Sequence, residues 1–139
     1  MFYAIKLTKQ ENGYLVTSPD LPECVYDAKT AEDAEKDASQ LLPGVMEFIY
    51  RRKRRAIPLP KPVEKGDIPI RVPVKVQAKI LLWNYMVENR YRLTDIAKML
   101  DISVAQAQRY VDLSKDGASL RAIEDALDAL GKSFELKII

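Results

Sequence analysis

The sequence predicts an α+β fold in which an N-terminal β-β-β-α-β unit is joined to a C-terminal all-α domain that ends in a β-strand. Two observations carry this prediction. Before about Gly66 the apolar residues mostly alternate with a period of two, as in strands, around a single helical stretch. From Val76 onward their spacing is helical, until the C-terminal end alternates again. We therefore expect two domains, residues 1–73 and 74–139.

Three strands are expected near the N-terminus. The run FYAIKLT has one uniformly apolar face, and YLVTS resumes the alternation after the Asn12-Gly13 pair. This pair is typical of short hairpin turns, because both residues tolerate positive φ. The two prolines of SPDLPE cannot donate hydrogen bonds within a sheet, so this segment is predicted to be a corner before a third strand, CVYDA.

A helix is predicted after Thr30, because threonine is a favourable N-cap and acidic residues follow it in the first turn. The Pro43-Gly44 pair interrupts the apolar stripe of this helix, so we expect two helical pieces, with a kink or break before residues 46–52. The proline-rich segment AIPLPKPVEKGD then reads as an extended connector to a fourth strand at Ile68–Val72.

The basic run RRKRR, residues 51–55, has two interpretations. It is a nucleic-acid patch, or it is a group of solvated cations at the C-terminal end of a helix, where the dipole favours positive charge. We favour the second, because charge runs alone are unspecific.

Two short amphipathic helices with a tight turn between them are predicted in RLTDIAKMLDISVAQAQRYVDL. A small inner-face residue allows close crossing, and a serine followed three residues later by glutamine matches a capping box. The arrangement indicates a DNA-binding helix-turn-helix, although a generic pair of packed helices would look similar. Small residues permit close approach, an amide can pair with adenine, and a guanidinium suits guanine or phosphate. The candidate DNA-binding residues are Ser103, Ala105, Gln106, Gln108 and Arg109.

A further helix, SLRAIEDALDALG, is followed by SFELKII, whose residues alternate between apolar and charged. No second strand lies nearby in sequence, and a lone strand is unstable. We therefore expect this segment to pair with its copy in a second chain. The resulting homodimer would read a palindromic operator.

Several function classes are excluded by residue types. Histidine is absent, which excludes imidazole bases and histidine-containing zinc sites, and Cys24 is the only cysteine, so no internal disulfide or cysteine-rich metal site is possible. No apolar run approaches the roughly 20 residues of a membrane span, and the N-terminus lacks the pattern of a signal peptide. We expect a cytoplasmic protein with no cofactor and no metal.

The corner and the strand after it carry three acids, Asp20, Glu23 and Asp27. A metal-dependent nuclease could use such carboxylates, but it would need acids converging from the first strand, which has none. Asp20 can instead be a turn residue that bonds to nearby backbone. We therefore expect no catalytic residues. A repressor with a small-molecule sensor at its N-terminus is a further alternative.

The sequence also resembles a known family. GYLVTSPDLPECV is similar to the G-Y-x-V-x-x-P-D-L-P-G-C signature of HicB antitoxins from bacterial toxin-antitoxin modules, in their long form with a C-terminal helix-turn-helix. Similarity continues through TAEDAEKDASQLL, IPLPKP, IRVPVKVQAKILLWN, LTDIAKMLDIS and DALGKSFELKII, and so covers essentially the whole chain. Glu23 stands where the signature usually has glycine, and Leu93 where repressor domains often have glutamine.

The resemblance implies an N-terminal partial RNase H-like or dsRBD-like unit that binds a small RNA-cleaving toxin of the HicA type and covers its active site. It implies a C-terminal half that binds the promoter of its own operon, in a homodimer or homotetramer. An acidic rim beside the sheet suits a basic RNA-binding toxin. Asp20, Glu23 and Asp27 are therefore the candidate toxin-binding residues.

Overall fold

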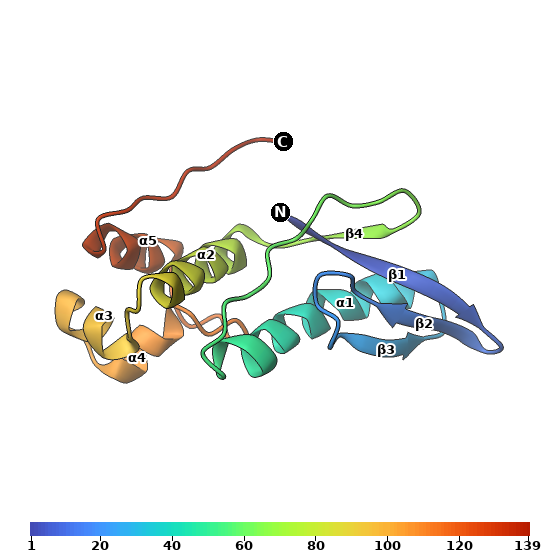
Figure 1. Ribbon diagram of the computed structural model, residues 1–139, viewed down its shortest axis with the longest axis horizontal. Helices are drawn as coiled ribbons and strands as arrows, with labels where there is room; N and C mark the ends of the chain where they lie inside the picture. The colour runs from blue at the N-terminus through green and yellow to red at the C-terminus, as the bar shows by residue number, and fades with distance from the viewer.

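The strands expected in the N-terminal half form one antiparallel sheet in the computed structural model, which describes residues 1–139 (Figure 1). Its strands are β1 (Phe2–Gln10), β2 (Gly13–Thr17), β3 (Val25–Ala28) and β4 (Ile68–Arg71). They lie in the order β3-β2-β1-β4, so the meander of the first three strands is extended by β4 on the far side of β1. The β-β-β-α-β order predicted from the apolar alternation is confirmed.

The first hairpin is closed one residue earlier than the Asn-Gly signal suggests. Gln10 pairs with Gly13, so Glu11 and Asn12 form the two-residue loop and Gly13 begins β2. Gly13 has φ 134°, and a Cβ atom on it would stand 2.4 Å from the carbonyl oxygen of Ala28. Glycine is required here because the backbone of β3 approaches so closely, in addition to its freedom in the turn.

One helix, α1 (Ala31–Val45), covers the inner face of this sheet (Figure 1). Thr30 caps it as predicted, since its Oγ1 accepts a hydrogen bond from the backbone N–H of Asp33 at 3.1 Å. Small residues on the buried face let the helix lie close to the strands; the buried positions are Ala34, Ala38 and Leu42.

The two helical pieces expected around Pro43-Gly44 are found, but no gap separates them: α1 ends at Val45 and the chain passes directly into a second piece that begins at Met46. Proline removes one N–H donor, but the N–H of Met46 bonds to the carbonyls of both Leu42 and Pro43, so the ladder resumes within one turn. What changes is the hydrogen-bond pattern. From Met46 to Arg51 the chain forms a π-helix, η1, with bonds to the fifth residue along instead of the fourth.

The extended connector, residues 56–67, runs between the two halves of the chain before entering β4. At its start the Nε1–H of Trp83 donates to the carbonyl of Arg55 at 2.9 Å. The side chain of Asn84 pairs with both backbone groups of Ile57, accepting from its N–H at 2.7 Å and donating to its carbonyl at 2.8 Å. The connector is thus tied to the helical half by side chains that reach its backbone.

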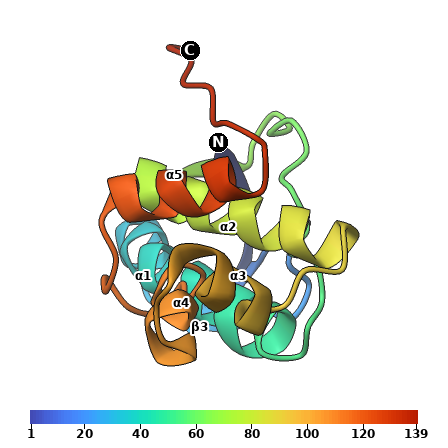
Figure 2. The same cartoon turned by 90° about the vertical axis from the view of Figure 1, so that its left-hand side faces the viewer.

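The helical half contains α2 (Val74–Glu88), α3 (Leu93–Leu100), α4 (Val104–Arg109) and α5 (Leu120–Ala129). The longest, α2, lies between the sheet end and the other helices, while α3 and α4 form the opposite end of the molecule (Figures 1 and 2). Trp83 of α2 is buried and belongs to the apolar core.

The turn between α3 and α4 is as short as the sequence indicates. Asp101 adopts a left-handed conformation, with φ 54°, and Ser103 then caps α4 by accepting a hydrogen bond from the N–H of Gln106 at 3.0 Å. Gly131, with φ 79°, ends the last helix. The two short helices and their turn are confirmed, and their role as a helix-turn-helix stays a prediction.

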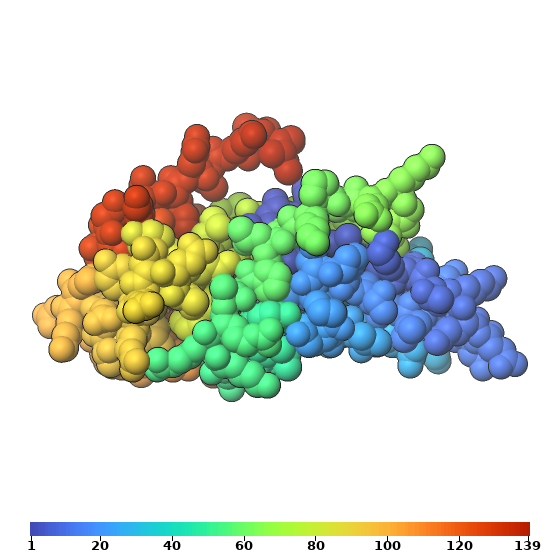
Figure 3. Space-filling view, viewed as in Figure 1, coloured from blue at the N-terminus to red at the C-terminus, as the bar shows by residue number.

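The C-terminal tail, residues 132–139, is extended but belongs to no sheet. Figure 3 shows it standing clear of the body with an open groove beneath it. Phe134 is half-buried against α2 and α5, whereas Leu136 is 75% exposed and Ile138 is 100% exposed. The predicted dimer strand therefore stays a prediction, because a strand needs a partner that a single chain does not supply.

A single cluster of thirty buried apolar residues runs through both halves. The domain boundary expected after residue 73 falls in the turn between β4 and α2. The division into domains 1–73 and 74–139 stays a prediction, and the buried cluster crosses the boundary between them. None of the helices combines the length and the apolar character that crossing a membrane would need.

Candidate functional site

The acidic corner is partly a structural element. Asp20 is only 9% exposed, and its Oδ1 accepts a hydrogen bond from the backbone N–H of Lys61 at 3.2 Å. Nearby, the hydroxyl of buried Ser18 donates to the carbonyl of Ala4 at 3.0 Å. Asp20 is thus not on an exposed rim. As the turn interpretation anticipates, it bonds to backbone, but to the connector and not to its own turn.

The other two acids of the corner are exposed but do not converge. Both carboxylate oxygens of Glu23 lie within hydrogen-bond distance of the Tyr50 hydroxyl, at 2.9 and 2.7 Å, which places this acid beside the end of η1. Burial, together with this hydrogen bond, raises the pKa of Tyr50. Asp27 lies on β3 opposite Leu15. Nowhere in the chain do three acidic, cysteine or histidine side chains gather in a way that could hold a metal ion.

The predicted DNA-binding residues are brought together at the free end of the helical half. Ala107 is the one fully buried residue of α4, and it faces the core. All five candidates are exposed, on the helix or its cap; they are Ser103, Ala105, Gln106, Gln108 and Arg109. An amide and a guanidinium group are therefore available on one short helix, as the sequence predicts.

Arg109 and the chain after it are held in defined positions. Its side-chain carbons lie against Gly117, where a Cβ would be 3.4 Å from the nearest of them. Behind this segment, buried Lys79 of α2 donates from Nζ to the carbonyls of Asp112 and Lys115, both at 2.7 Å. Burial lowers the pKa of Lys79. These contacts fix the loop that follows α4 against the body of the protein.

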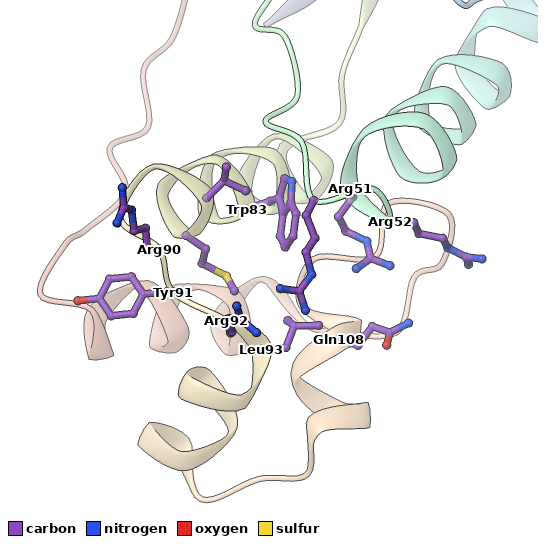
Figure 4. Close-up of a pocket in the computed structure, with 11 residues that line it drawn as sticks. Arg51, Arg52, Trp83, Arg90, Tyr91, Arg92, Leu93 and Gln108 are labelled. Atoms are coloured by element: carbon purple, nitrogen blue, oxygen red, sulfur yellow. The ribbon is translucent and has the colours of Figure 1, made fainter.

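Beside α4 lies a cleft of about 660 Å³, here named the arginine cleft, between the end of η1, the α2–α3 turn and α4 (Figure 4). No acidic residue lines it. Arginine supplies five of its residues, and the remainder are aromatic, apolar or amide side chains. The complete lining is Arg51, Arg52, Arg54, Trp83, Met86, Val87, Arg90, Tyr91, Arg92, Leu93 and Gln108.

Arg51 does not match the expected solvated run of cations, since it is only 5% exposed. It donates through Nε and Nη2 to the two carboxylate oxygens of fully buried Glu47, the first at 2.6 Å, and its guanidinium lies 5.8 Å from the centre of the Trp83 ring. Arg52 adds a bond from Nε at 2.9 Å. The π-helical pattern explains this pairing, because bonds to the fifth residue place the fourth and fifth side chains near the same acid.

The carboxylate of Glu47 also makes a hydrogen bond to the helical half of the chain. Its Oε1 accepts a hydrogen bond from the backbone N–H of Leu113 at 3.0 Å. Arg54, Arg90 and Arg92 take part in none of the salt bridges. The two interpretations of the basic run are thus both too simple: its first residue is a buried structural cation, and others line an open cleft.

The arginine cleft could not be found from one sequence window, because its arginines come from two distant segments. The run at 51–55 is one signal, and the short basic and aromatic segment NRYRL is another. Neither segment by itself indicates that it lies beside the other. Their contact depends on the packing around buried Glu47, and no local pattern predicts that Glu47 is buried.

Known proteins resemble the chain along its whole length. A family model described as HicB_like antitoxin of bacterial toxin-antitoxin system matches residues 2–81. The chain is 34% identical to Antitoxin HicB 2 of Photorhabdus laumondii, over 100% of this chain and 97% of that protein. It is 29% identical to Antitoxin HicB of Escherichia coli K12, over 100% of both, and 26% identical to Antitoxin HicB of Pseudomonas fluorescens, over 98% and 92%.

Proposed function

Because the chain belongs to the HicB-like antitoxin family of bacterial toxin-antitoxin systems, we propose that it neutralises a small HicA-type RNA-cleaving toxin and represses its own operon by sequence-specific DNA binding. The N-terminal half would hold the toxin and the helical half the operator. The family match and the whole-length similarity support the antitoxin role.

The toxin-binding role is supported by the exposed acids of the N-terminal half. A toxin that binds RNA must present cationic groups to phosphates, and acids placed at those groups would compete with the RNA. Glu23 and Asp27 are exposed and meet this requirement, whereas Asp20 is buried and holds the connector. We therefore retain Glu23 and Asp27 as contact residues and assign Asp20 to the support of the corner.

The observation that carries the DNA-binding role is the set of exposed side chains on α4. Gln106 can pair bidentately with adenine, Arg109 with guanine or phosphate, and Ala105 leaves room for a close approach. In this proposal α3 and α4 act as a helix-turn-helix and α4 enters the major groove. The packed side of α4, at Ala107, is separate from these side chains.

The toxin role is tested by co-expression with the protein encoded beside this chain. Tagged antitoxin should co-purify with a small basic protein and suppress its RNA cleavage at equal molar amounts. A free-standing sensor would elute alone, and that result would contradict the proposal. The nuclease alternative is tested with the purified protein and Mg²⁺. Neither the wild type nor Asp20→Ala should cleave RNA.

The DNA role is tested by Gln106→Ala. Removing a bidentate pairing with a base should weaken operator binding by ~1–3 kcal/mol and relax the preference at one base position. Toxin neutralisation should be unchanged at equal protein levels. If this substitution released toxicity, the division of roles between the two halves would be wrong.

The dimer is tested by removing residues 133–139. The exposed apolar residues of the tail, Leu136, Ile138 and Ile139, have no partner within one chain, which supports pairing with a second copy. The shortened chain should be monomeric by light scattering and should lose operator affinity while still binding toxin. A shortened chain that stayed dimeric would contradict this assignment.

A further inference from the structure

We propose that the arginine cleft binds the phosphate backbone of the operator duplex beside the bases that α4 reads. The inference rests on the proposed DNA-binding function and deepens it. Its new content is that the N-terminal half, through the end of η1 and the residues after it, takes part in holding DNA. The predicted DNA-binding residues all lie in the helical half, and they do not imply that the N-terminal half contacts DNA.

The charge in the cleft supports an anionic ligand. Arg51 and Arg52 are used in neutralising Glu47, but the guanidinium groups of Arg54, Arg90 and Arg92 form no salt bridge. No acidic side chain lines the cleft to offset them. Arginine presents a planar fork of donors that matches two phosphate oxygens at once, so unpaired arginines around an open cleft are suited to phosphate groups.

The position of the cleft indicates duplex DNA as the source of these phosphates. Gln108, which lines the cleft, belongs to the same short helix as Gln106 and Arg109. Arg92, which also lines the cleft, is the residue before α3. A duplex placed against α4 would therefore have its backbone at the cleft. Contacts to the backbone fix the register of the protein on DNA and carry no base information.

The backbone conformation of two cleft residues supports a role for their side chains. Arg54 has φ 56° and Arg90 has φ 58°, so both lie in the left-handed region, each just after a helix. Glycine is the usual residue at such positions, because a side chain there is strained. Arginine occupies two such positions on the same cleft, which supports a role for both guanidinium groups.

The aromatic residues argue against single-stranded RNA as the ligand. Recognition of single strands relies on open aromatic faces that stack on bases. Trp83 is 6% exposed and lies beneath the guanidinium of Arg51, and Tyr91 stacks on Tyr85 with ring centres 6.3 Å apart. The cleft thus offers several cations, while its tryptophan is buried and one face of its tyrosine is covered, and this favours backbone phosphates over stacked bases.

The test uses the full-length double variant Arg54→Gly, Arg90→Gly. Both substitutions relieve left-handed strain, so the thermal midpoint should stay the same or rise. Affinity should fall both for the duplex upstream of the chain's own operon and for a random duplex. The slope of log K against log salt should decrease by about 1 for each phosphate that the protein no longer neutralises, while base preference is retained. Lys53→Gln, which removes a neighbouring exposed cation outside the cleft, is the matched control and should change the slope less.

The outcomes separate the two proposals. A double variant that binds both duplexes with wild-type affinity and salt slope overturns the cleft assignment while leaving DNA binding by α4 intact. A double variant that loses affinity for a single-stranded RNA and not for duplex DNA also overturns it. If the wild-type protein binds neither duplex, then the DNA-binding function itself is wrong, and the cleft assignment falls with it.

Discussion

The carboxylate of Glu47 accepts a hydrogen bond from the backbone N–H of Leu113, at 3.0 Å, across 66 positions of sequence. The acid comes from η1, which continues α1, and the donor comes from the loop after α4. Since the same carboxylate also binds Arg51 and Arg52, one buried group orients the basic run and joins the two halves of the molecule.

Replacing Glu47 by glutamine should be strongly destabilising. It would leave the buried guanidinium of Arg51 without its counter-charge, and breaking a buried pair in this way costs about 3–5 kcal/mol of unfolding free energy. Chemical denaturation followed by circular dichroism measures this loss. The control is Glu64→Gln, whose side chain is 80% exposed and lies 3.6 Å from Lys6; its effect should stay below ~1 kcal/mol. Equal effects of the two substitutions would show that the Glu47 network adds little.

Asn84→Ala should also destabilise, through the connector. The substitution leaves the N–H and the carbonyl of Ile57 without partners inside the protein, and each unsatisfied buried group costs about 1–3 kcal/mol. The matched control is Asn89→Ala, because Asn89 is exposed and makes one bond, to the carbonyl of Tyr85. A surface change of this kind should cost no more than ~0.5 kcal/mol. The urea midpoints of unfolding of the two variants are compared. If Asn89→Ala lowers the midpoint as much as Asn84→Ala, the role of Asn84 in holding the connector is contradicted.

The acidic corner should separate into a binding part and a structural part. Reversing the charge of the exposed acids, in Glu23→Lys with Asp27→Lys, should weaken toxin affinity at least tenfold. Asp20→Asn should lower the thermal midpoint while leaving affinity nearly unchanged, because it weakens the bond to the Lys61 N–H. Calorimetric titration with an inactive toxin measures the affinity. Unchanged affinity in the double variant would reduce the corner to a turn.

Stability should fall at alkaline pH because of tyrosine burial. Burial raises the pKa of Tyr26 to about 12, with smaller contributions from Cys24 and Asp37, and raises that of Tyr3 as well. An unfolded tyrosine ionises near pH 10, so between about pH 10 and pH 12 unfolding releases protons and the unfolding free energy decreases as pH rises.

The decrease should be smaller in Tyr26→Phe, which lacks this ionisable group. Tyrosinate absorbance recorded alongside circular dichroism tests the point. In the wild type, part of the tyrosine signal should appear only as the protein unfolds. A complete rise in absorbance near pH 10 with the fold intact would contradict the prediction.

Local chemistry predicts the elements of this chain well. Thr30 and Ser103 cap the helices whose starts their residue types indicate, and the alternating runs of the N-terminal half form the expected strands. Pro43 shows the limit of such rules, because the carbonyls and N–H groups around it find partners and the helix continues.

Contacts between distant residues are not predictable in this way. The sequence around Asp20 indicates an exposed acid or a local turn residue, but Asp20 bonds to Lys61. The run that contains Arg51 indicates a solvated cation, but Arg51 pairs with a buried acid one turn earlier. In each case the deciding fact is burial, which depends on where the connector and the helical half pack. The hydrophobic period or motif of a ten-residue segment does not indicate how such distant segments pack against it.

The shared network around Glu47 has a consequence for the lifetime of the protein in the cell. If the proposed function holds, toxin neutralisation and promoter binding would be lost in the same event, because global unfolding would dismantle both halves of the molecule together. A protease that captures the unfolded chain would then free the toxin and open the promoter at once, and replacement antitoxin could be made without delay. Under the proposed function, the buried acid would thereby link the two activities in time as well as in space.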